Sequence, residues 1–309
     1  MGWLKRLFST PKLDLPDQRA TREPREPARS QTRRTPARVT PTRREPDWRS
    51  YDWEDVAEAY AKVLAPMMTE PYRDLLALAG RTDASRSVLD IGAGTGEELT
   101  GLDGLVVGVD ASQRMLLEGR KRAPGVRVAA ADLIDLPFRA AAFDIVTASF
   151  VLPEVTKLDT ALFDMIRVIK PGGVLGVSVW TEVNDDLTRT WRDLALEKLG
   201  PELLRDAFRQ GAPWMDKLAD AKHVEQVMRD AGLRSVRVEK RRYRNELARD
   251  DYVRGKEVEV VGRYLHRMLG AERWEAFKQA ARDRFAQRFG ERIVDFRDVL
   301  LAVGTKPRA

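Results

Sequence analysis

The sequence predicts an α/β protein in which helices cover both faces of a largely parallel sheet. Two observations support this fold class. From residue 53 onward, short β-rich runs alternate five times with segments of helical periodicity, an order typical of parallel strand–helix units. The 309 residues include 43% hydrophobic side chains, enough for a sizeable core in one domain of about 250 residues or in two smaller ones.

The predicted elements follow one another in a regular order. Helical periodicity covers residues 53–65 and 71–79, and Pro66 separates these helices because proline interrupts helical hydrogen bonding. Five buried strands are expected next, at residues 87–91, 105–109, 126–130, 143–149 and 174–180. Helices with a break at 211–213 are expected over 186–231, followed by two further strands at 236–243 and 295–305.

The basic character of the chain lies in its first 48 residues. They carry 12 Lys and Arg against 6 Asp and Glu, whereas the rest of the chain carries 42 of each. Their Pro- and Arg-rich composition predicts a disordered tail ahead of a domain over 49–309, because so few apolar residues cannot offset the entropy of ordering. Residues 1–8 are predicted to be either a frayed terminus or a short amphipathic segment that weakly contacts an anionic membrane or a partner.

Composition also excludes several kinds of chemistry. The chain has no cysteine, which excludes disulfides, thiolate–metal sites and a cysteine nucleophile. Its two histidines, His223 and His266, are too few for a histidine-only metal site, and both are expected at the surface, so no metal is predicted. No apolar run approaches the roughly 18–20 residues of a spanning helix, and no secretory signal is evident, so a cytoplasmic location is expected.

The most informative motif is VLDIGAGTGE, residues 88–97. A buried strand ends in a glycine-rich turn that is expected to open a helix, where a ligand can approach the backbone and its unpaired N–H groups. Dinucleotide-binding turns have the spacing G-x-G-x-x-G, but here Glu97 occupies the place of the third glycine. A pyrophosphate is disfavoured beside that carboxylate.

Four further features follow in order along the chain. Asp110 ends the second strand, where a carboxylate can accept both hydroxyls of a ribose. Asp132 follows the third strand, residues 143–149 form a buried fourth strand, and a Pro-Gly-Gly turn at 171–173 precedes the fifth. Any one of these features is common in parallel α/β sheets, but the occurrence of all of them in this order is rare.

With these motifs the sequence resembles the S-adenosylmethionine-dependent methyltransferases with a Rossmann-like fold, in particular the quinone-biosynthesis and small-molecule type. The resemblance covers residues 51–180 with specific motifs, and 181–309 only loosely. It implies a seven-stranded sheet whose last strand is antiparallel, and S-adenosylmethionine as the cofactor. It also implies residues that hold each part of the cofactor. They begin at the methionine end, continue past the ribose and the adenine, and return to the methionine side: Asp90, Gly92, Ala93, Gly94, Gly96, Asp110, Ala111, Met115, Asp132, Leu133, Ser149 and Phe150.

Methyl transfer from a sulfonium is an in-line displacement, so the protein contributes mainly alignment and exclusion of water. A base is needed only where the acceptor loses a proton, and Glu154, just after the fourth strand, is a weak candidate for it. The alternative is a residue at a helix start with no chemical role. Five aromatic side chains could cover the cofactor or the acceptor, or could simply pack in the core or at the surface: Trp53, Tyr60, Trp180, Trp191 and Trp214.

Residues 246–290 are predicted to form a helical insertion before the last strand. Two amphipathic patterns meet at Gly270: Val261, Tyr264, Leu265 and Met268, then Trp274, Phe277, Ala281, Phe285 and Phe289. Such helices could cap the acceptor site, with Tyr264 and Met268 facing it, or could pad the sheet edge or a dimer contact.

The leading hypothesis is therefore an enzyme that methylates a small molecule. Residues 150–154, FVLPE, do not match the Asn/Asp-Pro-Pro-aromatic run of nucleic-acid amino-methyltransferases, and cytosine C5 chemistry would need a cysteine. The alternative is a non-catalytic protein of the same fold that contacts nucleic acid or membrane through its basic tail.

Overall fold

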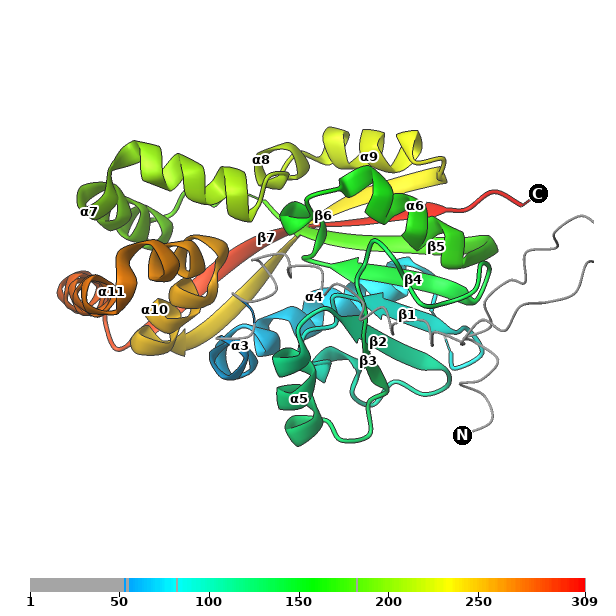
Figure 1. The fold of residues 1–309 in the computed structure, drawn as a ribbon, viewed down its shortest axis with the longest axis horizontal. Helices are drawn as coiled ribbons and strands as arrows, with labels where there is room; N and C mark the ends of the chain where they lie inside the picture. Colours follow the sequence, from blue (N-terminus) through cyan, green and yellow to red (C-terminus); the bar gives the residue numbers. More distant parts are fainter. Residues whose placement is uncertain (1–52, 54–55, 82, 182, 309) are drawn as a thin grey trace, which may run out of the picture.

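The computed structural model describes residues 53, 56–81, 83–181 and 183–308 (Figure 1). The predictions for the basic tail, residues 1–48, lie outside this part of the chain. Within it, no helix combines the length and the apolar character that crossing a membrane requires. The described residues also contain no group of three or more His, Asp and Glu side chains arranged to hold a metal ion.

The described residues form one seven-stranded sheet with the order β3-β2-β1-β4-β5-β7-β6. The first five strands pair in parallel, and β7 runs antiparallel to both of its neighbours, as the sequence resemblance implies. The strands are β1 Val88–Ile91, β2 Val106–Asp110, β3 Val128–Ala130, β4 Phe143–Ser149, β5 Ile169–Trp180, β6 Arg234–Ala248 and β7 Arg292–Thr305.

Helices cover both faces of the sheet, as predicted. On one face, α6 (Leu158–Val168) and α9 (Ala221–Asp230) share a core with residues of β1, β2 and β4. On the other face, α4 (Ala65–Leu78) packs on β1, β4 and β7. The remaining helical elements are α3 (Ala57–Val63), η1 (Glu97–Leu99), α5 (Gln113–Arg122), η2 (Leu152–Glu154), α7 (Asp186–Gly211), α8 (Met215–Leu218), α10 (Arg249–Val258) and α11 (Val260–Arg288).

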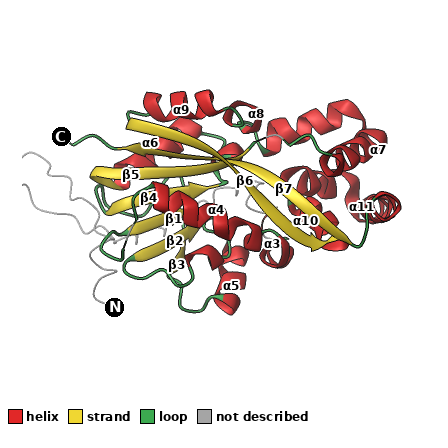
Figure 2. Cartoon of the chain, turned by 180° about the vertical axis from the view of Figure 1, so that it is seen from behind, coloured by secondary structure: helices red, strands yellow, loops and turns green. Residues whose placement is uncertain are grey.

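The last two strands extend beyond the rest of the sheet. Pairing of β5 with β7 ends where Trp180 lies opposite Val299, but β7 continues to pair with β6 as far as Arg292. Helices α7, α10 and α11 pack at this end and build a second core of their own (Figures 1 and 2). Because β5 ends at Trp180, this extension lies beyond the carboxyl ends of the parallel strands. We call α10 and α11 the helical cap.

The predicted helical insertion is confirmed, with small changes in its bounds. It begins at Arg249 because β6 continues to Ala248, and it is broken at Gly270, whose φ of 71° and ψ of 168° are not helical. The predicted stripe of aromatic side chains lies inside the second core, where Trp274 stacks on Phe277 and Phe277 meets Trp191 edge-on.

The two helices predicted on either side of Pro66 are present as α3 and α4, with Pro66 in the first turn of α4, where proline is tolerated. Two local predictions were wrong. The helix expected after the glycine-rich turn is only the short η1, because Thr100 is extended and Gly101 takes a φ of 75°. The Pro-Gly-Gly segment at 171–173 belongs to β5, beside a shift in register with β4, and is not a turn ahead of the strand.

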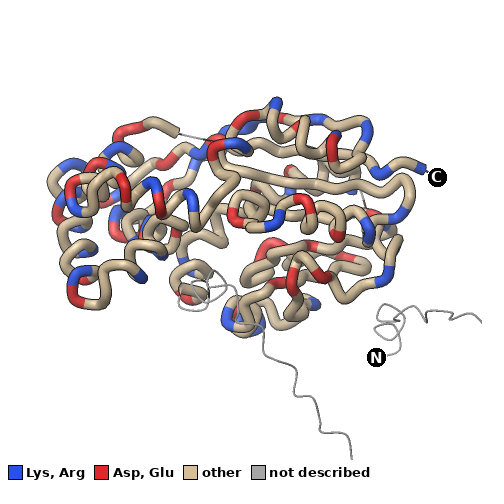
Figure 3. The backbone as a smooth tube through the Cα atoms, turned by 45° about the horizontal axis from the view of Figure 1, so that its top comes forward, with Lys and Arg blue, Asp and Glu red and all other residues tan. Residues whose placement is uncertain are grey.

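Charges of both signs are dispersed over the described chain (Figure 3). This agrees with the balance of 42 basic and 42 acidic side chains outside the first 48 residues. The functional site must therefore be sought in local arrangements of charge and not in the net charge.

Candidate active site

The glycine-rich turn follows β1 at the carboxyl edge of the sheet. Gly92, Gly94 and Gly96 have φ values of 71°, 54° and 68°, a conformation that side chains with a Cβ rarely adopt. At Gly92 space is also lacking, because a Cβ there would lie 2.3 Å from a methyl carbon of Val151. The turn therefore needs glycine both for its conformation and for the close approach of the segment after β4.

Asp110, at the end of β2, holds this turn in place. Its Oδ2 accepts a hydrogen bond from the Gly94 amide at 2.8 Å, and its Oδ1 accepts one from the Ser112 amide at 2.8 Å. Ser112 in turn caps α5 by accepting from the amide of Met115, whose side chain is buried near Gly94. The two motifs that the sequence placed at neighbouring strand ends are thus in direct contact.

Asp90 is buried in β1 beneath the turn, with 1% of its surface exposed. Its Oδ1 accepts a bond of 2.6 Å from Thr147 Oγ1, which lies 3.2 Å from the Tyr72 hydroxyl, whereas its Oδ2 has no hydrogen-bond partner among the described residues. Burial, together with the nearby Asp110 carboxylate, raises the pKa of Asp90 to about 7.

Glu98 adds a second buried carboxyl group that no sequence pattern marks. It lies in η1, and among the described residues neither its buried Oε2 nor the buried Thr95 hydroxyl has a hydrogen-bond partner. Burial, followed by the charge of Asp90, raises the pKa of Glu98 to about 8. Two buried carboxyl groups, Asp90 and Glu98, therefore lie close to the turn, an arrangement suited to a cationic ligand.

These two groups predict a dependence of stability on pH. A carboxyl group whose pKa is raised by folding stabilises the protein below its unfolded pKa, near 4, and that contribution is lost as the pH rises through the folded pKa. We expect the free energy of unfolding to fall by on the order of 2 kcal/mol between about pH 5 and about pH 8.

Urea denaturation at both pH values measures this change. Glu98→Gln should flatten the profile, because the amide cannot ionise. An equally steep decline in the Glu98→Gln protein would contradict the assignment to this cluster.

Tyr60 lies against the glycine turn, and Trp53 contacts Tyr60. The Tyr60 ring lies 3.3 Å from the position that a Cβ on Gly94 would occupy, and Trp53 meets Tyr60 edge-on with ring centroids 5.4 Å apart. Burial and the charge of Glu98 hold the pKa of Tyr60 well above its usual range, so this hydroxyl stays protonated.

At the end of β4, two predicted residues meet the end of β5. Ser149 and Ser178 are joined through their hydroxyls at 2.8 Å, and the Phe150 ring stacks on Trp180 with centroids 4.1 Å apart. Phe150 has a φ of 59°, unusual for a residue with a bulky side chain, and such strain is found preferentially at functional sites. We call Phe150 and Trp180 the aromatic shelf.

Glu154 has two charged or polar partners through its Oε2. The indole N–H of Trp53 donates to it at 3.2 Å, and Arg263 of α11 donates at 2.7 Å. These contacts tie η2, which contains Glu154, to Trp53 and to the helical cap. Arg263 has no motif in the sequence, since the two side chains that it contacts, Glu154 and Trp53, lie more than 100 residues away.

The remaining predicted residues are more scattered. Asp132 is exposed just after β3 and accepts from the Ile134 amide, while Leu133 packs against the core and Ala111 is exposed. Both histidines are exposed, as expected. Trp191 belongs to the second core, and Trp214 lies beside η2, where its backbone N–H donates to Pro153.

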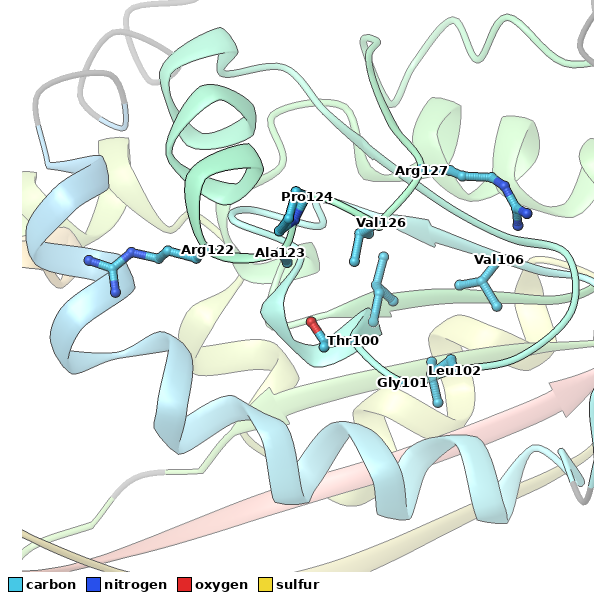
Figure 4. Close-up of a pocket in the computed structure, with 11 residues that line it drawn as sticks. Thr100, Gly101, Leu102, Val106, Arg122, Ala123, Pro124, Val126 and Arg127 are labelled. Atoms are coloured by element: carbon cyan, nitrogen blue, oxygen red, sulfur yellow. The ribbon is translucent and has the colours of Figure 1, made fainter. Parts of the chain in front are cut away.

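One cavity of about 270 Å³ lies away from this site (Figure 4). It is lined by residues 99–102, by Val106 at the start of β2 and by residues 122–127. The start of β2 is the opposite edge of the sheet from Asp110 and the glycine turn. The cavity is therefore separate from the site described above.

Comparison with known proteins identifies a methyltransferase domain over residues 89–177. The demethylmenaquinone methyltransferase of Paenarthrobacter aurescens is 33% identical over 196 residues, which cover 58% of this chain and 76% of that protein. The ubiquinone/menaquinone biosynthesis C-methyltransferase of Shewanella halifaxensis is 33% identical over 167 residues, covering 48% of this chain and 66% of the relative.

A solved structure has the same fold. Haemonchus contortus phosphoethanolamine N-methyltransferase 2, in complex with phosphomonomethylethanolamine and S-adenosylhomocysteine, aligns with a TM-score of 0.50 at 17% identity. The alignment covers 82% of this chain and 58% of that one.

Proposed function

The chain belongs to the S-adenosylmethionine-dependent methyltransferases, and we propose that it methylates a planar aromatic small molecule of the quinone class. The cofactor is S-adenosylmethionine, in agreement with the expectation from sequence. The fold of seven strands with an antiparallel seventh strand also agrees with this family.

The buried polar atoms of the site fit this cofactor. S-adenosylmethionine carries an ammonium and a sulfonium, and the unpartnered oxygens of Asp90 and Glu98 lie buried around the glycine turn. We assign the methionine end to Asp90 and to the turn that contains Gly92, Ala93, Gly94 and Gly96. A bound cation would favour the ionised forms of both carboxyl groups, whose pKa values burial and mutual charge repulsion raise.

We assign the ribose to Asp110, because each oxygen of a carboxylate can accept more than one hydrogen bond. Its carboxylate is already oriented by the amides of Gly94 and Ser112, so little reorganisation is needed on binding. The adenine is assigned to Met115 and Ala111 on one side and to Asp132 and Leu133 on the other.

The acceptor assignment depends on one observation, the aromatic shelf. Phe150 and Trp180 lie next to Ser149 at the carboxyl edge, where the cofactor and acceptor must meet. Stacked rings offer a flat apolar surface that favours another planar ring. The names of the two relatives, which refer to demethylmenaquinone and to ubiquinone and menaquinone, support the same class of acceptor.

The bound cofactor supplies a methyl group on a positively charged sulfur, and its transfer disperses that charge. The residues of the chain therefore act by placement: the shelf orients the acceptor, and Tyr60 and Trp53 restrict water. Glu154, held by Trp53 and Arg263, is better suited to maintaining this arrangement than to removing a proton.

The test of the acceptor site is Trp180→Leu. Loss of the stacked ring should lower kcat/KM for a demethylated quinone in its reduced, hydroquinone form by about tenfold, because an aromatic pair contributes about 0.5–1.5 kcal/mol beyond its buried area. Affinity for S-adenosylhomocysteine should stay within about twofold of wild type. Trp191→Phe, in the second core, serves as the control and should retain both values.

An unchanged kcat/KM in Trp180→Leu, or equal activity toward a non-aromatic acceptor, would refute the aromatic shelf as the acceptor site. The comparisons do not favour the alternative of a non-catalytic protein acting through its basic tail. The domain over 49–309 and a dispensable tail remain predictions: a chain that begins at Arg49 should bind S-adenosylhomocysteine as the full chain does.

A further inference from the structure

The helical cap packs beside the cofactor site through α10 and through the elbow between its two helices. We define the elbow as residues 258–263. Val258 is buried against Val63, Leu64 and Met68, and the same cluster includes Tyr60, Trp53 and the aromatic shelf. The views from both sides place α10 beside α3 (Figures 1 and 2).

The cap residues that the sequence singled out are not at this contact. Tyr264 is buried in the second core, and Met268 is 51% exposed. The expectation that these two side chains face the acceptor is therefore not met. The residue that faces the site is Arg263, one position before Tyr264 and on a different side of the helix.

Arg263 is 6% exposed and makes three contacts at the elbow. Its guanidinium donates to the Val258 carbonyl at 2.9 Å and to Glu154 Oε2 at 2.7 Å, and its central carbon lies 3.6 Å from the centroid of the Trp53 ring. Trp53 donates to the same carboxylate oxygen. A buried arginine in this geometry combines a charge-assisted bond with stacking on an indole, which a lysine cannot reproduce.

The chain of contacts continues to the glycine turn. Trp53 meets Tyr60 edge-on, and Tyr60 lies against Gly94. Gly94 is also the residue whose amide Asp110 holds. A change at Arg263 therefore has a continuous path of packed rings and hydrogen bonds to the cofactor site.

We propose that Arg263 is a positioning residue that holds Glu154 and Trp53, keeps Tyr60 over the glycine turn, and thereby couples the helical cap to cofactor binding. This proposal rests on the cofactor site proposed above. It assigns to Glu154 the role of a shared acceptor between η2, the segment at Trp53 and the cap. The coupling is reciprocal: a ligand that orders Tyr60 also orders the elbow.

The experiment measures S-adenosylhomocysteine affinity by calorimetry in Arg263→Met, Glu154→Ala and the double variant. Each single variant should weaken binding by about tenfold, and the double variant by little more, because both substitutions break the same connection. Glu154→Gln, which keeps an acceptor oxygen, and Arg263→Lys, which keeps the charge, should each restore part of the affinity.

Hydrogen exchange supplies a readout that a purely structural role would not change. In the wild-type protein, S-adenosylhomocysteine should protect the amides of residues 258–263 as well as those of 92–96. In Arg263→Met, the protection at 258–263 should be lost while that at 92–96 persists at saturating ligand.

Leu265→Ala is the control for general weakening of the cap, because Leu265 is fully buried in the second core. It should lower the melting temperature but leave the affinity within about twofold of wild type. Trp53→Phe removes the indole donor without emptying the site, and it should weaken binding even if Arg263→Met fails to fold.

Wild-type affinity and elbow protection in the Arg263 and Trp53 variants would overturn the coupling alone. Failure of the wild-type protein to bind S-adenosylhomocysteine would overturn the cofactor site as well. Equal loss of affinity in Leu265→Ala would show a general effect of cap stability and would likewise overturn the specific role of Arg263.

Discussion

Replacing Asp110 by alanine is expected to weaken S-adenosylhomocysteine binding by about 1.5–3 kcal/mol, or roughly 10- to 150-fold, the usual value of hydrogen bonds to a charged group. The carboxylate contributes in two ways, as the proposed ribose acceptor and as the acceptor for the amides of Gly94 and Ser112. Its removal therefore takes away a ligand contact and loosens the turn that holds the methionine end.

Calorimetry measures the change, and Asp103→Ala is the control. Asp103 is exposed and lies three residues before β2, at the opposite edge of the sheet from Asp110. Its removal should leave the affinity within about twofold of wild type, because this carboxylate has no part in the proposed site. Wild-type affinity in Asp110→Ala, or tight binding of NAD by the native chain, would contradict the assignment.

The second large effect is expected at Gly92. A Cβ there would lie 2.3 Å from a Val151 methyl, in a backbone with a φ of 71°. Gly92→Ala should lower the free energy of unfolding by about 1–3 kcal/mol and weaken S-adenosylhomocysteine binding by at least about tenfold, because the turn must shift to admit the methyl group.

Variants at two other glycines distinguish the conformational cost of a positive φ from the steric clash with Val151. Gly101 has a φ of 75° but open space around it, so Gly101→Ala should show only the conformational cost, about 1 kcal/mol. Gly125 has neither a positive φ nor a nearby atom, so Gly125→Ala should be neutral or slightly stabilising. If all three variants unfold at the same urea concentration, the close packing of the turn against Val151 is not what requires glycine at position 92.

The sequence by itself determined the features that depend on neighbouring residues. Strand and helix periodicity located all seven strands of the sheet, and the spacing of Gly92, Gly94 and Gly96 distinguished the turn from a dinucleotide site. Asp110 could be predicted because a carboxylate at the end of the second parallel strand must lie near the turn after the first. These inferences need only local patterns and the rule that parallel strands share an edge.

The tertiary structure alone decided which distant side chains meet. Glu98 is buried because η1 packs against α4, and no periodicity marks that burial. Arg263 and Glu154 are separated by 109 residues, and they meet because the long β6–β7 extension carries the cap beyond the carboxyl edge of the sheet.

The aromatic shelf has the same origin. Phe150 and Trp180 belong to neighbouring strands, but their stacking depends on the positive φ at Phe150 and on where β5 ends. A hydrophobic period of 2.0 residues in a strand, or of 3.6 residues in a helix, indicates which face of that element a side chain occupies. It carries no information about which distant element packs on that face. For this reason the glycine-rich turn and its contact with Asp110 could be predicted from the sequence, whereas the contact between Arg263 of the cap and Glu154 could not.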